Sequence, residues 1–208
     1  ILHPDGDIPL FGDAALGMHT PPRALIALAQ ELTGEGTPSV LNNSYALAPS
    51  GFYVLGAADR SARMIIKAGD AGPDYQLAHA HGDHGSYELG IGPHRVIVDS
   101  GVHGYADSPF RAYCRSTRAH NTVRVNGIEQ LECWSAFRVG SRYQSGGAQL
   151  QLDENGGQFT CRLRMAGSIE HTREVSHELK TDTWLIMDTI TGPGELHAES
   201  FLHLHPDL

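Results

Sequence analysis

Five of the thirteen histidines in this 208-residue chain lie between positions 79 and 103. The string HAHGDHG places His79 and His81 two residues apart, so in an extended segment both imidazoles would point to the same face. A pair of neutral imidazoles is a common way to bind zinc, iron, copper or nickel. The spacing therefore predicts a divalent-metal centre at this pair, where a second histidine could also carry protons near neutral pH.

Two later residues extend this candidate site. Asp99 ends the apolar run RVIV, where a carboxylate costs free energy unless it is paired or coordinated, and His120 directly precedes the segment NTVRV. Two histidines and a carboxylate leave one coordination position open, as catalytic zinc sites do. We therefore predict His81, Asp99 and His120 as metal ligands. Zinc is the favoured ion, with calcium or another divalent ion as the alternative.

The segment 102–119 between two predicted strands is rich in arginine and tyrosine. Long loops on a β scaffold are where binding and catalytic sites are often built. Arg111, Arg115 and Arg118 could bind a substrate carboxylate through two hydrogen bonds each and lower the pKa of a nearby tyrosine. Salt bridges on a solvated loop explain the same arginines equally well.

One helix and about ten strands are expected around these residues. Pro21 and Pro22 favour a helix start, ALIALAQEL follows with one apolar face, and Gly34 and Gly36 favour its end, before a linker over 37–50. Period-two patterns then predict strands at 51–58, 62–69, 86–92, 94–101, 121–127, 148–154, 158–165, 168–179, 183–192 and 195–205. Turns are expected at Asp59–Arg60, Gly92–Pro93 and Gly156–Gly157. Strands at this spacing favour a mainly β fold, an antiparallel sandwich or barrel.

Composition narrows the classes of partner. The formal net charge of −9 argues against nucleic acid, and any anionic substrate would need a local basic patch. No stretch approaches the roughly 18 apolar residues that span a bilayer, so a membrane is not an expected partner. The three cysteines, Cys114, Cys133 and Cys161, show no metal-binding spacing. Aromatic residues make up only 7% of the chain, which gives no sign of an exposed stacking platform, and Trp134 and Trp184 are expected in the core or a cleft wall.

Four motifs carry a resemblance to a known family. In order, HAHGDHGSYEL, RVIVDSGVHGY, RSTRAHNTV and WSAFRVGSRY resemble the central β-domain of the heparinase II/III-like polysaccharide lyases, over about residues 50–205. Proteins of this family join an N-terminal α/α toroid to a C-terminal antiparallel β-sandwich. The resemblance implies that residues 1–45 are the end of the toroid with a linker, and that 46–208 are the sandwich domain, cut within a longer protein at both ends. It also suggests a periplasmic or secreted location.

The resemblance implies β-elimination on an anionic, uronic-acid-containing polysaccharide. A base removes the C5 proton of the uronate, whose carboxylate is neutralised, and the bond to the 4-O oxygen breaks. The family's catalytic histidine falls on His79, and its metal ligands fall on His81, Asp99 and His120. Tyr105 is the loop tyrosine expected to face the cleft, with Tyr113 as the alternative. Arg115 and Arg118 are the expected substrate contacts. The toroid supplies much of the remaining catalytic equipment, so we expect this chain to need it for activity.

Two other readings fit parts of the pattern. A cupin-type metalloenzyme would also carry an H-x-H pair on β structure, but its glutamate is expected four or five residues later, whereas Glu88 follows His81 by seven. A non-catalytic carbohydrate-binding or structural β-sandwich is the third reading. His84 stands where the family usually has an apolar residue, so it is either a further polar group of the site or an exposed side chain.

Overall fold

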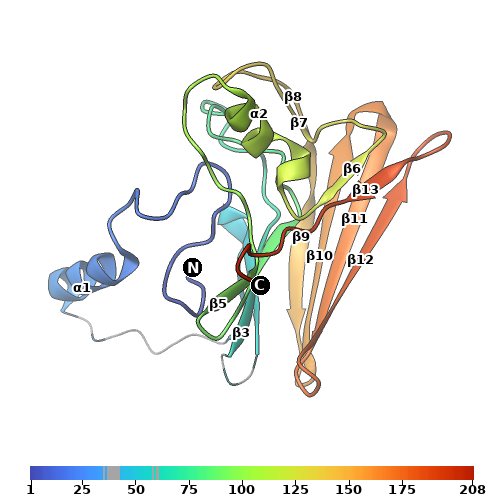
Figure 1. The fold of residues 1–208 in the computed structure, drawn as a ribbon. Helices are drawn as coiled ribbons and strands as arrows, with labels where there is room; N and C mark the ends of the chain where they lie inside the picture. The colour runs from blue at the N-terminus through green and yellow to red at the C-terminus, as the bar shows by residue number, and fades with distance from the viewer. Residues whose placement is uncertain (35, 37–42, 58, 60) are drawn as a thin grey trace.

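The protein is a sandwich of two antiparallel sheets (Figure 1). The structure, a computed structural model, describes residues 1–34, 36, 43–57, 59 and 61–208. The predicted antiparallel β-sandwich is confirmed.

The first sheet has five strands in sequential order. They are β1 (Tyr45–Leu47), β2 (Phe52–Gly56), β3 (Ala62–Lys67), β4 (Ser86–Ile91) and β5 (His94–Ile97), with the short 3-10 helix η1 (Ala48–Ser50) between β1 and β2. The two predicted hairpins correspond to the antiparallel pairs β2–β3 and β4–β5. Of the turn predicted at Asp59–Arg60, Arg60 lies outside the described residues.

The second sheet has four strands in the order β12-β11-β10-β9. Their bounds are β9 (Gln144–Leu152), β10 (Gly156–Met165), β11 (Ile169–Glu178) and β12 (Thr183–Thr191), and the 3-10 turn η3 (Ala166–Ser168) joins β10 to β11. The turn predicted at Gly156–Gly157 is wrong, since both glycines lie in β10. Asp153 makes the turn instead, because its Oδ1 accepts hydrogen bonds from the amides of Asn155 (2.7 Å) and Gly156 (3.0 Å).

The core lies between the two sheets. Leu55 and Ile66 of the first sheet pack with Phe159 and Val175 of the second, and all four are almost fully buried. The ring of Tyr53 lies 4.8 Å from that of Phe159 across the interface. These side chains form one core shared by both sheets.

Shorter elements gather at the end of the sandwich that carries the predicted site (Figure 1). β6 (Val123–Val125) pairs with β13 (Ala198–Ser200), and β7 (Leu131–Cys133) pairs with β8 (Val139–Arg142). The segment predicted as a loop contains the helix α2 (Pro109–Arg115) and the 3-10 turn η2 (Thr117–Ala119). Ser108 caps α2 and Pro109 begins it, but a seven-residue helix is too short to show a clear apolar period.

Residues 1–14, which we call the N-terminal strap, lie against the first sheet. Glu88 of β4, fully buried, accepts hydrogen bonds from the His3 imidazole (2.9 Å) and the Leu10 amide (2.6 Å). On β3, Arg63 donates to the Leu2 carbonyl oxygen at 2.7 Å. These contacts fix the path of the strap and so the position of its last residues.

The predicted helix is confirmed as α1 (Pro22–Thr33), and Gly34 ends it in a left-handed conformation. It stands apart from both sheets in Figure 1 and contains no buried residue. Part of the predicted linker, residues 37–42, lies outside the described residues, and the remainder forms β1 and η1. Among the described residues no helix is long and apolar enough to cross a membrane.

Candidate functional site

The site is built from the loop between β3 and β4, the segment around α2 and η2, and the N-terminal strap. His79 and His81 lie in the loop, outside the two strands, so the extended geometry assumed for them is not present. They converge all the same, because each donates a hydrogen bond to a different oxygen of one carboxylate. That carboxylate belongs to Asp13 of the strap.

Asp13 is the centre of this arrangement. It accepts hydrogen bonds from His79 Nδ1 at 2.7 Å and from His81 Nε2 at 2.8 Å. The guanidinium of Arg111 pairs with both of its oxygens, through Nη1 to one and through Nη2 at 3.0 Å to the other. Burial works against ionisation, but these donors outweigh it and hold the pKa of Asp13 well below its usual value. Asp13 is therefore ionised and fully engaged.

His79 stays accessible although its Nδ1 is bound. Its side chain is 53% exposed, whereas His81 is buried. The Tyr105 ring meets the His79 ring edge-on at 5.9 Å and stacks on Phe137 at 5.9 Å with an interplanar angle of 15°. Arg111 lies over both aromatic rings, at 5.4 and 5.8 Å. The two predicted catalytic residues, His79 and Tyr105, are thus neighbours in the structure.

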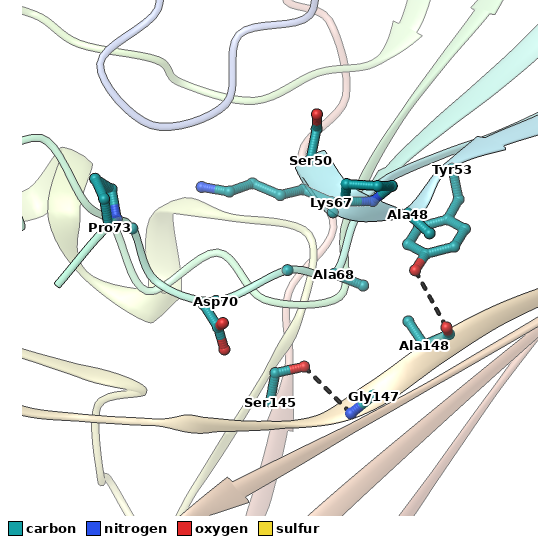
Figure 2. Close-up of a pocket in the computed structure, with 14 residues that line it drawn as sticks. Ala48, Ser50, Tyr53, Lys67, Ala68, Asp70, Pro73, Ser145, Gly147 and Ala148 are labelled. Atoms are coloured by element: carbon teal, nitrogen blue, oxygen red, sulfur yellow. Dashed lines mark hydrogen bonds between the residues drawn. The ribbon is translucent and has the colours of Figure 1, made fainter.

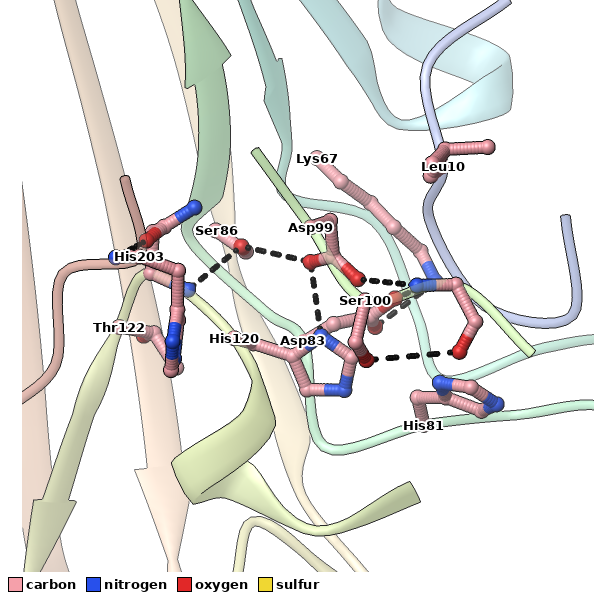
Figure 3. A network of polar contacts seen from close by, with 12 residues as sticks. Leu10, Lys67, His81, Asp83, Ser86, Asp99, Ser100, His120, Thr122 and His203 are labelled. Carbon is pink, nitrogen blue, oxygen red and sulfur yellow. Dashed lines mark hydrogen bonds and ion pairs between the residues drawn. The ribbon is translucent and has the colours of Figure 1, made fainter. Parts of the chain in front are cut away.

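A second, buried group lies beside this one (Figure 3). His120 Nδ1 donates to Asp99 at 2.7 Å, and Asp99 also accepts from the Ser86 hydroxyl (3.3 Å) and the Gly101 amide (3.2 Å). The imidazoles of His81 and His120 are 5.3 Å apart. The three predicted metal ligands therefore converge, with Asp99 held against His120.

Asp83, which the sequence analysis did not single out, is buried next to these histidines. Lys67 of β3 reaches it with Nζ at 2.6 and 2.7 Å from the two carboxylate oxygens. Burial opposes ionisation of Asp83, but the positive charge of Lys67 holds its pKa below the usual value. Its partners, Lys67 and the Gly12 amide, are 16 and 71 residues away in the sequence, so no local spacing pointed to it.

The two buried histidines differ in charge preference. Burial is the main cause that lowers the pKa of His81, and repulsion from His120 adds to it, against the Asp13 hydrogen bond. Burial also disfavours charge on His120, but attraction to Asp99 and the hydrogen bond to it prevail and raise its pKa. His81 is therefore the more readily neutral imidazole.

Two imidazole nitrogens of the site are available to a metal ion. His81 Nδ1 and His120 Nε2 are buried and have no hydrogen-bond partner in the part of the chain that the structure describes. Each ring donates its other nitrogen to a carboxylate, which is how metal-ligating histidines are usually oriented. Among the described residues, no three His, Cys, Asp or Glu side chains form a preformed ligand set. The imidazole nitrogens of His81 and His120 fit a cation. Asp99 is the hydrogen-bond acceptor of His120.

The loop arginines divide into two kinds. Arg111 and Arg115 are buried on one face of α2, and Arg118 is exposed after it, with its guanidinium over the Tyr113 ring at 5.7 Å. Arg115 donates to the main-chain carbonyls of residues 77, 80, 135 and 136. Arg115 therefore stabilises the surrounding main chain. Of the two predicted substrate contacts, Arg118 is the one that is accessible to a ligand.

The prediction that His84 joins the site or is exposed is wrong. His84 is buried, and its ring packs edge-on against Tyr143 at 5.1 Å. Burial is the main cause that lowers the pKa of His84, to about 3. It is therefore a neutral residue of the interior.

A pocket of about 580 Å³ borders the site between η1, the end of β3 and β9 (Figure 2). Small side chains line most of it. The Tyr53 hydroxyl donates to Ala148 O at 3.2 Å, and the Ser145 hydroxyl accepts from the Gly147 amide at 3.3 Å. Lys67, at its edge, is paired with Asp83. Tyr53, Ser145 and Lys67 are therefore engaged within the protein, and Ser50 and Asp70 also line the pocket.

The comparisons with known proteins agree with this architecture. The family model described as heparinase II/III-like, C-terminal, matches residues 40–208. The search of curated proteins gave no match. Among solved structures, a heparan sulfate lyase mutant from Pedobacter heparinus is similar, with a TM-score of 0.78 and 22% identity over 98% of this chain and 32% of that one. The heparan sulfate lyase from the same organism gives 0.74 and 23%, over 93% and 31%.

A heparinase III gives a TM-score of 0.72 and 21% identity, over 94% of this chain and 32% of its own. This chain therefore spans about a third of the length of these solved proteins. The cupin reading is set aside, because the matched region covers both sheets and the site histidines. The chain belongs to the heparinase II/III-like family, and its residues 40–208 match that family's C-terminal region.

Proposed function

We propose that this chain is the β-domain of a polysaccharide lyase that cleaves a uronic-acid-containing polysaccharide by β-elimination. The observation that carries the proposal is the accessible imidazole of His79, oriented by the buried Asp13 carboxylate and placed beside Tyr105. A base held in one tautomer by a carboxylate is a recurrent arrangement for proton transfer.

In this proposal His79 handles the proton that the reaction moves. Its Nδ1–H donates to Asp13, so Nε2 is the nitrogen that holds a lone pair towards solvent. Nε2 takes the C5 proton of the uronate, the electron pair forms the C4–C5 double bond, and the C4–O4 bond breaks. The departing oxygen needs a proton, which the Tyr105 hydroxyl or water supplies. Asp13 stabilises the imidazolium that forms.

The uronate carboxylate must also be neutralised, and Arg111 is not free to do this. Its guanidinium bonds Asp13 and the carbonyls of Ala78 and Ala136, and it is buried. We expect Arg118, which is exposed, and residues of the full-length protein outside this chain to supply the positive charge. Arg118 and Arg138 are exposed and could attract an anionic substrate locally, although the chain has a net charge of −9.

We also propose that His81, His120 and Asp99 hold a divalent cation, with zinc favoured because both free donors are imidazole nitrogens. A bound cation would supply fixed positive charge next to His79. Through the cation, His81 would link the β3–β4 loop to His120 in the segment before β6. Asp99 and Asp13 orient the two imidazoles.

The lyase proposal is tested on the full-length protein by the ultraviolet absorbance of the unsaturated uronate product, with heparan sulfate and other uronate polymers as substrates. We expect His79→Ala to reduce turnover by roughly 100-fold or more. His94→Ala, at an exposed histidine that begins β5, should leave it unchanged. No product from any uronate polymer, or equal turnover in both variants, would refute the proposal.

The metal proposal needs a separate test. Metal content of the purified full-length protein should fall in His120→Ala and in His81→Ala, and stay unchanged in His94→Ala. Added chelator should also lower the unfolding temperature of the parent protein, because binding to the folded state stabilises it. A parent protein that is metal-free, and stays so after incubation with zinc, would refute this proposal.

A further inference from the structure

Two exposed aromatic side chains contact His79, and others lie in α2 and directly after β7, contrary to the expectation from composition. Trp134 is 66% exposed, and the other four, which are also exposed, are Tyr105, Phe110, Tyr113 and Phe137. Both tryptophans were predicted in the core or a cleft wall; the exposure of Trp134 excludes the core for it, whereas Trp184 packs against the core. The low aromatic content of the whole chain therefore gave no sign of the exposed aromatic side chains near the site.

The indole of Trp134 is held in place by its polar edge. Its Nε1 donates to Glu132 Oε1 at 2.9 Å, and the other oxygen of Glu132 accepts from the Ser141 amide and hydroxyl at 2.9 and 3.0 Å. A Cβ on Gly140 would lie 2.4 Å from the Glu132 carboxylate and 2.8 Å from the indole nitrogen. The nitrogen is thus used within the hairpin, and the remaining exposed surface of the ring is apolar.

The β7–β8 hairpin is anchored to the catalytic group. Arg111 Nε donates to the Ala136 carbonyl at 3.1 Å, and Arg115 Nη1 donates to Ser135 and Ala136 at 2.9 and 3.0 Å. Phe137 contacts the His79 ring at 6.4 Å and stacks on Tyr105. Buried arginines therefore fix the tip of this hairpin at the place where the proposed chemistry occurs.

We propose that Trp134 and Phe137 form a stacking platform for pyranose rings of the polysaccharide next to the cleaved bond. A rigid aromatic face binds an apolar ring face at low entropic cost. Arg138, exposed and next to Phe137 in the sequence, adds a positive charge suited to a uronate or sulfate group. This site rests on the proposed function for its ligand class, a uronate oligosaccharide, but it requires only binding and not cleavage.

The experiment uses the full-length protein in a His79→Ala background, so that a heparan sulfate oligosaccharide stays intact while tryptophan fluorescence is titrated. Subtracting the Trp134→Phe signal removes the contribution of tryptophans elsewhere. We expect oligosaccharide to change the Trp134 fluorescence and to protect it from acrylamide. Trp184→Phe, on the strand β12 where the indole stacks on His177 at 4.0 Å, should leave this response intact.

Affinity gives the second readout. Trp134→Ala should weaken binding by roughly 10-fold, and Trp134→Phe by less than about 3-fold, because an aromatic face remains. A Trp134 that is already inaccessible to acrylamide without ligand, or an unchanged affinity in Trp134→Ala, would overturn the inference. Failure of the lyase assay with an intact Trp134 response would refute only the proposed function.

Discussion

Asp13→Asn is the most informative single change, because four hydrogen bonds end on that carboxylate. The amide keeps the shape but loses the charge, and its NH₂ group would face donors from Arg111 or a histidine. Removing one partner of a buried ion pair costs about 3–5 kcal/mol, because the other charge remains buried. Asp13 and Arg111 are both nearly buried, at 7% and 1% side-chain exposure, so little solvent screening reduces this figure.

Urea unfolding of the parent and the variant measures this difference. We expect a loss of about 3 kcal/mol at pH 7 for Asp13→Asn. For Asp5→Asn, whose pair with Arg95 is partly exposed, the loss should be below about 1 kcal/mol. The folded pKa of Asp13 lies below its usual 3.8, so its stabilisation is complete above that pH and is lost as the pH falls further. The gap between parent and variant should therefore shrink by about 1 kcal/mol at pH 3.

Two outcomes would refute this reasoning. One is an Asp13→Asn protein that loses no more stability than Asp5→Asn. The other is a gap that widens as the pH is lowered below 4, which would mean that the carboxylate is protonated in the folded state. In the lyase assay the same variant should lose activity together with His79→Ala, because His79 then lacks the partner that fixes its tautomer.

Three further changes test other parts of the structure by the same unfolding measurement. Folding lowers the pKa of the buried His84 from 6.5 to about 3, so its contribution to stability is complete above pH 6.5. About 2 kcal/mol of the free energy of unfolding should be lost between pH 6.5 and about 4.5, and His84→Leu should flatten that pH profile. Arg115→Lys should cost about 2–4 kcal/mol, because an ammonium cannot serve four carbonyls, while Arg118→Lys should change stability by less than about 0.5 kcal/mol. Gly51→Ala should cost more than about 1 kcal/mol, since the residue has φ +71° and the new Cβ would lie 2.4 Å from the Gly69 Cα; equal stability would contradict that close approach.

The second sheet of the sandwich was predictable because burial alternates along its strands. Phe159, Cys161 and Leu163 point inwards between exposed or half-buried neighbours, and this period of two is visible in the sequence. The turn glycines were misplaced because Gly157 serves packing, where a Cβ would lie 2.5 Å from Leu55 of the other sheet. A glycine therefore marks either a turn or a close approach, and spacing alone does not separate the two.

The site was predictable only in part. Its histidines lie within one motif-rich region, but Asp13 is 66 residues before His79, so no spacing rule connects them. The three loop arginines look alike in sequence. Once residues 109–115 are known to be helical, Arg111 and Arg115 lie four apart on one face and Arg118 falls outside the helix. Their different tasks thus depend on a short helix that the sequence pattern did not reveal.

The N-terminal strap has a consequence for how this family can be divided into parts. The family match begins at residue 40, yet the carboxylate that organises His79, His81 and Arg111 is at position 13. A fragment cut at the homology boundary would keep both sheets and lose the counter-ion of its own centre. Such a fragment, exchanged into a relative, would lack the Asp13 hydrogen bonds to His79 and His81 unless the strap, with its His3 and Leu10 contacts to Glu88, is exchanged with it.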